Sequence, residues 1–496
     1  MIQHQAQAVA APPASDGPPP GRRAVSVLAP ARLERVEGWG MAHAADCRVL
    51  RPVNDEQVAA AFAEAQRWSW PVTLRGGGQS YGDAAIRQEA VLLDLTRMQR
   101  ILSWEPETGI IEVEPGTRIG DIWRHVVEDG WWPPVVSGTM FPTAGGAAAM
   151  NIHGKNNYRV GTFGEHLLSF DLLAPGGTHL HCSRDERAEI FHAAIGGLGM
   201  LGAITRVRLK MKRIYSGDVR VRAVTVRNLG EMLDCFEKHT DQDYLVGWVD
   251  GTARGRRLGR GLMHLARHLA PDEDPHAAAT LKVCHQELPD TFFGFVPKAS
   301  LWAGVWLFLH PPGMRVINAV KYHAGRREAA AGEYRQSHAA FNFLLDYVPN
   351  WKWAYRPGGL VQFQAFVPRQ RARTAFEALL GQGHAAGIPC YLGVVKKHRP
   401  DPFLISHGLD GYSLAMDFPV LTATRARLQA MARHLAGIVL AAGGRFYFAK
   451  DGVLLPEEAQ QAIGQDSLAR LRELKTRLDP RGVLESDLSR RLALFS

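Results

Sequence analysis

The sequence predicts a two-domain protein in which β-strands and α-helices are mixed. A chain of 496 residues exceeds the roughly 100 to 200 residues of one ordinary domain, so we expect two cores. Apolar residues make up 46% of the chain and charged residues 22%, as in other globular proteins. Short strand-like runs alternate with a few helix-like segments from Trp39 to Lys212, and aromatic strand-like runs return later in the chain.

The elements of the first domain follow from local composition. We expect a helix from Asp121 to Glu128, because Thr117 is a candidate N-cap and Gly130 is a stop signal. Strands are expected in three segments in which apolar and β-branched residues lie between turn residues: 91–95, 101–117 and 203–211.

The second domain has a different character. Residues 251–276 change from basic to acidic within one stretch, which predicts a mobile excursion. Strands are expected at 359–368 and 412–420, and the last helix should stop at Pro480. These shifts predict a disordered tail at 1–30, a first domain built from 31–215 and 445–496, and a second domain at 216–444.

Composition narrows the possible functions. The five cysteines contain no CxxC pair, which argues against a structural zinc or other metal site and favours a reducing compartment, the cytoplasm. The net charge of +9 indicates an anionic partner: nucleic acid, an anionic membrane surface or a phosphorylated substrate. No RRM-like, finger or recognition-helix pattern accompanies the charge, so we expect no nucleic-acid partner.

The most apolar stretch of the chain is 301–314. Its apolar run is too short to cross a bilayer, which takes about 20 residues. A run of this kind is more often a core segment, and we expect it in the core. The alternative is an exposed apolar patch that makes peripheral contact with the inner face of the cell membrane or with a lipid tail.

Three glycine-rich stretches are candidates for binding a ligand. GGLGMLG at 196–202 has the GxGxxG spacing of dinucleotide-binding loops. However, a helix-like segment precedes it and a strand follows it, the reverse of the order that brings a pyrophosphate to a helix N-terminus. We therefore reject a nicotinamide site there.

The other two stretches favour a long ligand. RGGGQSYGDA at 75–84 lies between two predicted strands, so it is either an anion-binding turn of backbone N–H groups or a tight hairpin. The polar, glycine-rich span 137–166 cannot pack a core, and such spans usually line a ligand. Together these loops would let backbone amides enclose an extended cofactor.

The same motifs resemble a known family. RGGGQSYGDA, TAGGAAAMNIHGKN, GTFGEHLLSFDLL and AIGGLGMLGAIT together resemble the flavin domain of the vanillyl-alcohol-oxidase superfamily. IHGKN followed by GTFGEH is similar to the decaprenylphosphoryl-β-D-ribose oxidase family, as are FQAFVP, MDFP and FYFAKD. The resemblance extends from about Trp39 to the C-terminus and weakens between 215 and 340.

The resemblance implies an α+β fold, with a PCMH-type FAD-binding domain at 31–215 completed by 445–496, and an antiparallel-sheet substrate domain at 216–444. It implies FAD-dependent oxidation of a sugar hydroxyl, C2′ of a polyprenylphosphoryl pentose, as the first half of an epimerisation. A separate NAD(P)H-dependent keto-reductase would complete that epimerisation. Alternatives are a flavoprotein of this fold that acts on a soluble sugar or alditol, or reduces a C=C bond, and a non-catalytic flavin-binding subunit.

The resemblance also assigns the residues that would hold FAD. Many sugar-alcohol oxidases of the superfamily have a histidine directly after the first glycines and tether the flavin through it. This chain has Gln79, and an amide cannot form that bond, so we expect non-covalent FAD and a dehydrogenase that passes electrons to an acceptor other than oxygen. The assigned residues are Gly76, Gly77, Gly78, Gln79, Ser80, Tyr81, Gly138, Thr139, Thr143, Gly146, Ile152, His153, Gly154, Asn156, Ile204 and Tyr447.

Oxidation of an alcohol needs a hydride acceptor and a route for the hydroxyl proton. Lys450 matches the lysine that the family places near the flavin and the substrate hydroxyl, although a lysine at such a position is otherwise more often solvated. His153 and Tyr81 are further catalytic candidates. A structural hydrogen bond to the flavin loop is an equally good role for His153.

Candidate substrate residues come from one strand pattern and from the resemblance. Gln362 and Gln364 alternate with apolar residues, so both amides lie on one strand face, where sugar hydroxyls would satisfy them unless that face is exposed to solvent. Lys396 could accept a phosphate, with Lys397 as the exposed neighbour. The remaining positions at which the family contacts its substrate are Tyr355, Ser413 and Lys155.

The sequence departs from the best-known branch of the family at three positions. Ser413 and Ala415 stand where that branch has asparagine and cysteine, and His398 replaces an aromatic residue. The pocket therefore lacks a thiol and part of the branch's hydrogen bonding. These departures put the identity of the sugar in doubt, while the redox reaction is unaffected.

Overall fold

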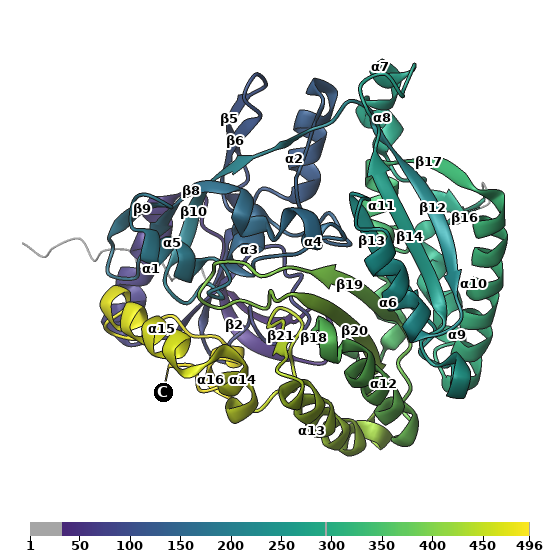
Figure 1. Cartoon of the computed structure of the whole chain (residues 1–496). Helices are drawn as coiled ribbons and strands as arrows, with labels where there is room; N and C mark the ends of the chain where they lie inside the picture. The colour runs from purple at the N-terminus through teal and green to yellow at the C-terminus, as the bar shows by residue number, and fades with distance from the viewer. Residues whose placement is uncertain (1–31, 293–294, 496) are drawn as a thin grey trace, which may run out of the picture.

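A computed structural model describes residues 32–292 and 295–495, and the tail predicted at 1–30 lies outside these ranges. The architecture is a mixture of helices and sheets (Figure 1), which confirms the predicted α+β class. The first part of the chain forms two small sheets, and the middle of the chain forms one large antiparallel sheet. The cavity described below lies between these parts.

The first small sheet has the strand order β1-β2-β4-β3. Strands β3 and β4 flank the RGGGQSYGDA loop and pair in parallel, so this loop is not a tight hairpin. The second small sheet has the order β5-β6-β10-β8-β9. The strands are β1 (Arg32–Glu37), β2 (Ala44–Leu50), β3 (Val72–Arg75), β4 (Val91–Asp94), β5 (Ile101–Glu105), β6 (Ile110–Val113), β8 (Leu167–Leu173), β9 (His179–Ser183) and β10 (Ala203–Lys210).

The large sheet has eight strands, all paired antiparallel, in the order β17-β12-β14-β13-β19-β20-β18-β21. In that order they are β17 (Glu333–Ser337), β12 (Asp218–Val226), β14 (Gly261–His268), β13 (Tyr244–Val249), β19 (Gly393–His398), β20 (Gly411–Pro419), β18 (Leu360–Pro368) and β21 (Arg445–Phe446). Two-stranded pairs complete the strands: β7 (Trp131–Trp132) with β11 (Lys212–Arg213), and β15 (Thr291–Phe292) with β16 (Val296–Pro297).

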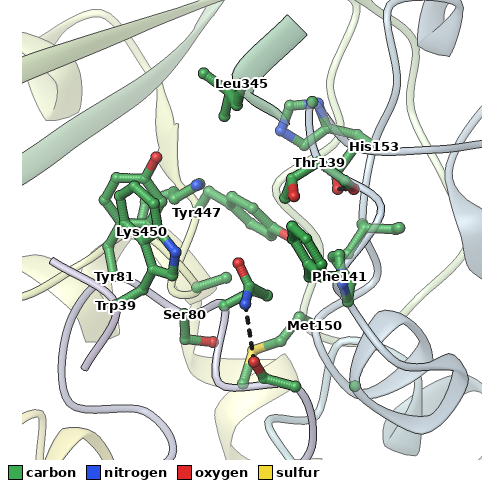
Figure 2. A pocket seen from close by; sticks show the side chains of 18 of the residues that line it. Trp39, Ser80, Tyr81, Thr139, Phe141, Met150, His153, Leu345, Tyr447 and Lys450 are labelled. Atoms are coloured by element: carbon green, nitrogen blue, oxygen red, sulfur yellow. Dashed lines mark hydrogen bonds between the residues drawn. The ribbon is translucent and has the colours of Figure 1, made fainter. Parts of the chain in front are cut away.

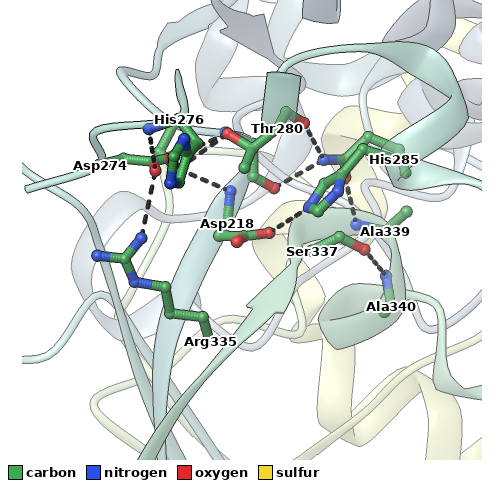
Figure 3. A network of polar contacts seen from close by, with 12 residues as sticks. Asp218, Asp274, His276, Thr280, His285, Arg335, Ser337, Ala339 and Ala340 are labelled. Atoms are coloured by element: carbon green, nitrogen blue, oxygen red, sulfur yellow. Dashed lines mark hydrogen bonds and ion pairs between the residues drawn. The ribbon is translucent and has the colours of Figure 1, made fainter. Parts of the chain in front are cut away.

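The predicted mobile excursion at 251–276 is wrong, because β14 lies inside the large sheet between β12 and β13. The charged flanks of this stretch hid the apolar strand between them. A polar network then fastens the chain that follows β14 (Figure 3): Asp274 accepts hydrogen bonds from Thr280 and Arg335 at 2.7 and 3.2 Å. His285 contacts Asp218 at 2.7 Å.

Helices cover the two faces of the large sheet unequally. Helices α6, α12 and α13 pack on one face, and α10 lies against β12 and β14 on the other, with Lys321 reaching Trp248 of β13. The part of that second face formed by β13, β19, β20 and β18 is therefore left for the cavity. The longer helices are α1 (Asp55–Trp68), α2 (Ile119–Val126), α6 (Leu229–Lys238), α10 (Pro311–Ala331), α12 (Arg369–Ala385), α13 (Arg425–Ala441), α14 (Pro456–Ile463) and α15 (Gln465–Leu478).

The remaining helices are short, and the C-terminal ones return to the first small sheet. The N–H of Val72 in β3 donates to the carbonyl of Val483, and Arg491 of α16 pairs with Asp83 at 2.8 Å. The short helices are α3 (Ala144–Ala149), α4 (Asn157–Val160), α5 (Ala188–Ala194), α7 (Ala277–Thr280), α8 (Val283–Gln286), α9 (Leu301–Leu307), α11 (His338–Asn342) and α16 (Asp487–Arg491).

Two local predictions need correction. The N-cap of α2 is Arg118 rather than Thr117, whose hydroxyl instead donates to the carbonyl of Arg100. Gly130 does end the following 3-10 turn, with φ of 78°. The core expectation for 301–314 is also wrong, since Trp306, Leu307 and Phe308 are exposed. Over residues 32–292 and 295–495, no helix has the length and apolar character needed to cross a membrane.

Candidate active site

A cavity of about 800 Å³ lies between the glycine-rich loops and the open face of the large sheet (Figure 2). This volume is in the range of cofactor and ligand pockets. Most of the predicted cofactor residues line it. They are Gly76, Gly77, Gly78, Gln79, Ser80, Tyr81, Gly138, Thr139, Thr143, Gly146, Ile152, His153, Ile204 and Tyr447.

Two predicted cofactor residues are not part of the wall that the described residues form. A side chain at Gly154 would lie 2.4 Å from Asn156 Oδ1. The amide nitrogen of Asn156 donates to the carbonyl of Pro134 at 2.8 Å. Gly154 and Asn156 therefore support the second loop from behind. The sequence motif locates this loop but does not show which of its residues face the cavity.

The first glycine loop packs directly on the second. A Cβ atom at Gly76 would lie 2.4 Å from Thr143 Oγ1, and one at Gly77 would lie 2.4 Å from the carbonyl oxygen of Phe141. Gly78 adopts a φ of 64°, which favours glycine. The glycines thus let two loops close on each other and present backbone to the cavity. Gln79 is folded onto the same loop, its amide nitrogen donating to the Gly77 carbonyl at 2.9 Å.

The third glycine stretch has the connection that rules out a nicotinamide fingerprint. Helix α5 precedes it and β10 follows it. Even so, Leu198, Gly199 and Gly202 line the cavity beside Ile204. All three glycine-rich stretches therefore meet at one cavity.

The open face of the large sheet forms the opposite wall. Strand register places Gln364 beside Ala415, and Ala415 beside Val394 of β19. Because side chains alternate along a strand, residues two apart share this face. Gln362 and Gln364 are both buried and both line the cavity, so the solvent-facing alternative is excluded. The face also carries Trp248, Lys396 and Ser413.

Lys450 lies at the junction of the two walls. Its Nζ is 3.4 Å from the centre of the Tyr81 ring. Burial lowers the pKa of Lys450, and the nearby carboxylate of Asp417 partly restores it. Burial likewise raises the pKa of Tyr81 well above its ordinary value. Lys450 is therefore held closer to its neutral form than a solvated lysine is.

Asp417 is a fully buried carboxyl group that sequence reasoning did not single out, although it lies in the MDFP motif. It faces Gln362 across β20 and β18, and the Gln362 amide nitrogen donates to its Oδ1 at 2.5 Å. Among the described residues, its Oδ2 has no hydrogen-bond partner. Burial raises the pKa of Asp417, while Gln362 and Lys450 lower it. The side chain of Gln362 also hydrogen-bonds to Tyr81, so it links Asp417 to the tyrosine beside Lys450.

Lys396 reaches the cavity and Lys397 does not. In the part of the chain that the structure describes, Lys396 makes no hydrogen bond or ion pair, and burial lowers its pKa to about 8. Lys397 points to the other face, where it pairs with Glu237 at 2.7 Å and is only 9% exposed. The expectation that Lys397 is the exposed neighbour is therefore wrong, because Glu237 covers it.

Two other predicted substrate residues are placed differently from each other. Lys155 lines the cavity, but its ammonium group donates to the carbonyls of Phe341 and Asn342, the latter at 3.3 Å. Tyr355 is buried in an aromatic and aliphatic cluster with Tyr81 and is not among the described residues that line the cavity. Tyr355 supports the wall from behind.

His153 is a buried, neutral imidazole. Burial lowers its pKa well below the ordinary value. Its Nε2 lies 3.0 Å from the amide nitrogen of Gln364, so it accepts that N–H, and Gln364 presents its oxygen elsewhere. The ring packs against His398, His407 and Tyr447 at centroid distances of 5.0, 5.3 and 5.2 Å.

Ser413 is polarised by the histidine that replaces an aromatic residue. Asn157 Oδ1 accepts from His398 Nδ1 at 3.0 Å and also from the N–H of Arg399. Burial lowers the pKa of His398, so its ring is neutral and Nε2 is an acceptor. The hydroxyl of Ser413, 2.8 Å from Nε2, therefore donates to His398 and keeps its lone pairs for the cavity.

The cavity also contains residues for which the sequence held no local signal. Asp346 accepts from the Thr139 hydroxyl at 2.6 Å and from the N–H of Met140 at 2.9 Å, and burial raises its pKa to about 6. Other cavity-lining residues of this kind are Trp39, Lys321, Trp351 and Lys352. They come from segments far apart in the chain, and only the fold brings them together.

Comparison with known proteins agrees with this geometry. The model of a family described as an FAD binding domain matches residues 48–183. Decaprenylphosphoryl-β-D-ribose oxidase of Mycolicibacterium smegmatis is 27% identical over 487 residues, which cover 94% of this chain and 99% of that protein.

Two further relatives match a smaller part of the chain. L-gulonolactone oxidase of Bos taurus is 29% identical over 190 residues, covering 38% of this chain and 42% of that protein. Cytokinin dehydrogenase 5 of Arabidopsis thaliana is 28% identical over 206 residues, covering 40% and 36%. The glycine loops that line the cavity lie within or next to the matched FAD-binding region. The chain contains an FAD-binding domain of the PCMH type found in FAD-linked oxidases, and it is an oxidoreductase that uses FAD.

Proposed function

We propose that the protein oxidises a secondary hydroxyl of a phosphate-linked sugar, at C2′ of a polyprenylphosphoryl pentose, as the first half of an epimerisation. The observation that carries this proposal is that Lys396 and two glutamines, Gln362 and Gln364, lie on the same cavity-lining face of the sheet. A buried ammonium group without a protein anion is costly, and a phosphate would satisfy it. Gln362 and Gln364 supply acceptor oxygens of the kind that sugar hydroxyls need.

The chemistry divides between the cofactor and this chain. Bound FAD supplies a hydride acceptor. Lys450 is placed to take the hydroxyl proton, because burial favours its neutral form. As the carbon–hydrogen bond breaks and the proton leaves the oxygen, the alcohol becomes a ketone. Asp417 would hold Gln362 in position and stabilise the ammonium form of Lys450 after proton transfer.

We further propose that the FAD is held non-covalently. Gln79 occupies the position next to the glycines, and its amide nitrogen has no nucleophilic lone pair to attach to a flavin. Acid precipitation of the purified protein tests this, since released FAD appears in the supernatant. Yellow colour retained in the washed pellet would mean that another residue forms the covalent bond.

A soluble sugar or alditol is the second candidate substrate. Ala415 favours it, because this small side chain lines the cavity where the best-known branch has cysteine, leaving a differently shaped site. Both candidates use the same hydroxyl chemistry. They differ in whether Lys396 has an anion to bind.

The deciding experiment is anaerobic mixing of the FAD-loaded protein with a short-chain polyprenylphosphoryl-ribose while flavin absorbance is followed. Bleaching with this compound, and little bleaching with ribose or an alditol at the same concentration, is the expected result. The reverse order would replace the phosphate-linked substrate with a soluble one. No bleaching with any of them would overturn the sugar assignment while leaving FAD binding intact.

The product of this reaction would be a keto-sugar that is still attached to its carrier. A separate NAD(P)H-dependent keto-reductase would complete the epimerisation. In a reaction with an artificial electron acceptor, we expect the keto product to accumulate until such a reductase is added. Direct appearance of the epimer without a reductase would contradict this division of labour.

A further inference from the structure

The surface formed by α9 and the outer side of α10 is unusually apolar for an exposed region. All seven residues of α9 are at least partly exposed. Trp306, Leu307 and Phe308 are 53%, 62% and 44% exposed, and Val316 and Val320, one turn apart on α10, are 55% and 64% exposed. We call these five residues the α9–α10 surface. Contiguous exposed apolar residues of this size usually mark a binding surface.

The same surface is basic. Arg315 and Arg327 lie on the outer side of α10 with Val316 and Val320. In the described ranges, Arg315, Arg326 and Arg327 form no ion pair with another part of the chain. Helix α10 has four basic residues, of which only Lys321 faces the cavity, and one acidic residue, Glu328, which is already hydrogen-bonded to Tyr334 at 2.6 Å. The surface therefore fits an anionic partner.

The surface lies on the outside of a wall of the cavity. Figure 1 shows α10 as the outermost helix at one end of the large sheet, with α9 beside its lower end. On its inner side, α10 carries Lys321, which lines the cavity with its Nζ 4.6 Å from the centre of the Trp248 ring. Trp302 of α9 packs edge-on against Trp353 at 5.7 Å. Trp351 and Lys352, which directly precede Trp353 in the chain, also line the cavity.

We propose that the α9–α10 surface docks on an anionic lipid bilayer. Tryptophan and phenylalanine insert at the boundary between head groups and acyl chains, and arginines beside them bind lipid phosphates. A second copy of this chain fits less well, because a symmetric dimer would bring the basic surface against itself. The inference deepens the proposed function and rests on it for the identity of the substrate, since a polyprenyl carrier resides in the bilayer.

Vesicle co-sedimentation of the FAD-loaded protein tests the docking without any substrate. We expect binding to vesicles of phosphatidylcholine with phosphatidylglycerol, weak binding to phosphatidylcholine alone, and loss of binding as salt rises. Replacing both Arg315→Gln and Arg327→Gln should weaken binding about 30-fold, at roughly a factor of five for each arginine. The matched control, Arg425→Gln with Arg427→Gln on α13, should bind like the parent.

A second variant tests the apolar part. Trp306→Ser with Phe308→Ser should abolish binding, whereas Leu33→Ser, a similarly exposed residue on β1, should not. Unchanged FAD content shows that each variant is folded. Failure of the parent protein to bind anionic vesicles would overturn the proposal. The proposal would also be overturned if sedimentation velocity showed that the parent protein is a dimer and that only the variant at Trp306 and Phe308 is a monomer.

These outcomes are separable from those of the proposed function. A water-soluble, short-chain substrate should reduce the flavin equally in the parent and in the α9–α10 variants. If vesicles bind but no phosphate-linked sugar bleaches the flavin, the proposed substrate fails and the docking surface remains. If the flavin bleaches but vesicles do not bind, only the docking surface fails.

Discussion

The two walls of the cavity are built by opposite means. One wall presents backbone, because Gly76 and Gly77 have no room for a side chain between two closely packed loops. The other wall presents side chains, because strand alternation directs Gln362, Gln364 and Lys396 toward the same space. A backbone wall suits a cofactor shared by many enzymes, while a side-chain wall can be altered one position at a time to suit one substrate. Variants of the two walls should therefore fail in different ways.

The largest effect is expected on the backbone wall. Gly77→Ala places a methyl group 2.4 Å from the carbonyl of Phe141, so one loop must move and the FAD content should fall close to zero. FAD per chain, measured from the absorbance of the purified protein, checks this. Gly176→Ala is the matched control, because a Cβ there has nothing within 4 Å. Full FAD content in the Gly77 variant would show that the loops are not a close-packed cradle.

At the junction of the walls, Lys450→Met should keep FAD but lose the chemistry. Removing the proposed proton acceptor is expected to lower kcat about 1,000-fold, as for other general bases. Stopped-flow flavin reduction under anaerobic conditions measures it directly. Activity retained in this variant would mean that another residue is the base.

On the side-chain wall, Lys396→Met should affect binding more than chemistry. Loss of a charge-assisted contact to phosphate is expected to raise KM for a phosphate-linked sugar about 30-fold with kcat little changed. A substrate without phosphate should show no such change in KM. Lys397→Met, on the opposite face, is the comparison variant. Equal losses for both kinds of substrate would mean that Lys396 supports the wall rather than binding an anion.

The smallest effect is a shift in pH dependence. The charge of Asp417 raises the pKa of Lys450, so Asp417→Asn should lower that pKa further. Lys450 would then be neutral at lower pH, and the acid side of the kcat/KM profile should move to lower pH. A purely structural role for Asp417 predicts reduced activity at every pH without such a shift. A shift toward higher pH would contradict the proposed coupling.

The sequence predicts those parts of the site whose residues form a recognisable pattern within one short segment. The glycine stretches and the alternation around Gln362 and Gln364 each lie within one short segment, and each leads to the cavity. Asp417 was missed because a buried acid within an apolar strand has no local signal for its partner. Tyr355 was misplaced because a matching position in a family does not say which side of a wall the side chain lies on.

The fold was predicted with similar strengths and weaknesses. The order of helix α5, glycine stretch and strand β10 was enough to reject a nicotinamide site. By contrast, strand β14 was missed because the apolar residues of this strand lie between charged flanks, and the whole stretch was judged by its charge. The segment at 301–314 was expected in the core because an apolar run does not reveal whether anything packs over it. Both errors concern what covers a segment, which depends on residues far away in the chain.

The hydrogen bond from Ser413 to His398 bears on how the reaction ends. With its hydrogen committed to His398, Ser413 can only accept at the cavity, as can the carbonyl oxygen of Gln364. An alcohol can donate to these oxygens, but the ketone made from it cannot. The oxygen lone pairs that accept a hydrogen bond from the substrate hydroxyl would then face the carbonyl oxygen of the product, which has no hydrogen to donate. In the proposed reaction, oxidation would thus lower the affinity of the site for the bound molecule and favour release of the product.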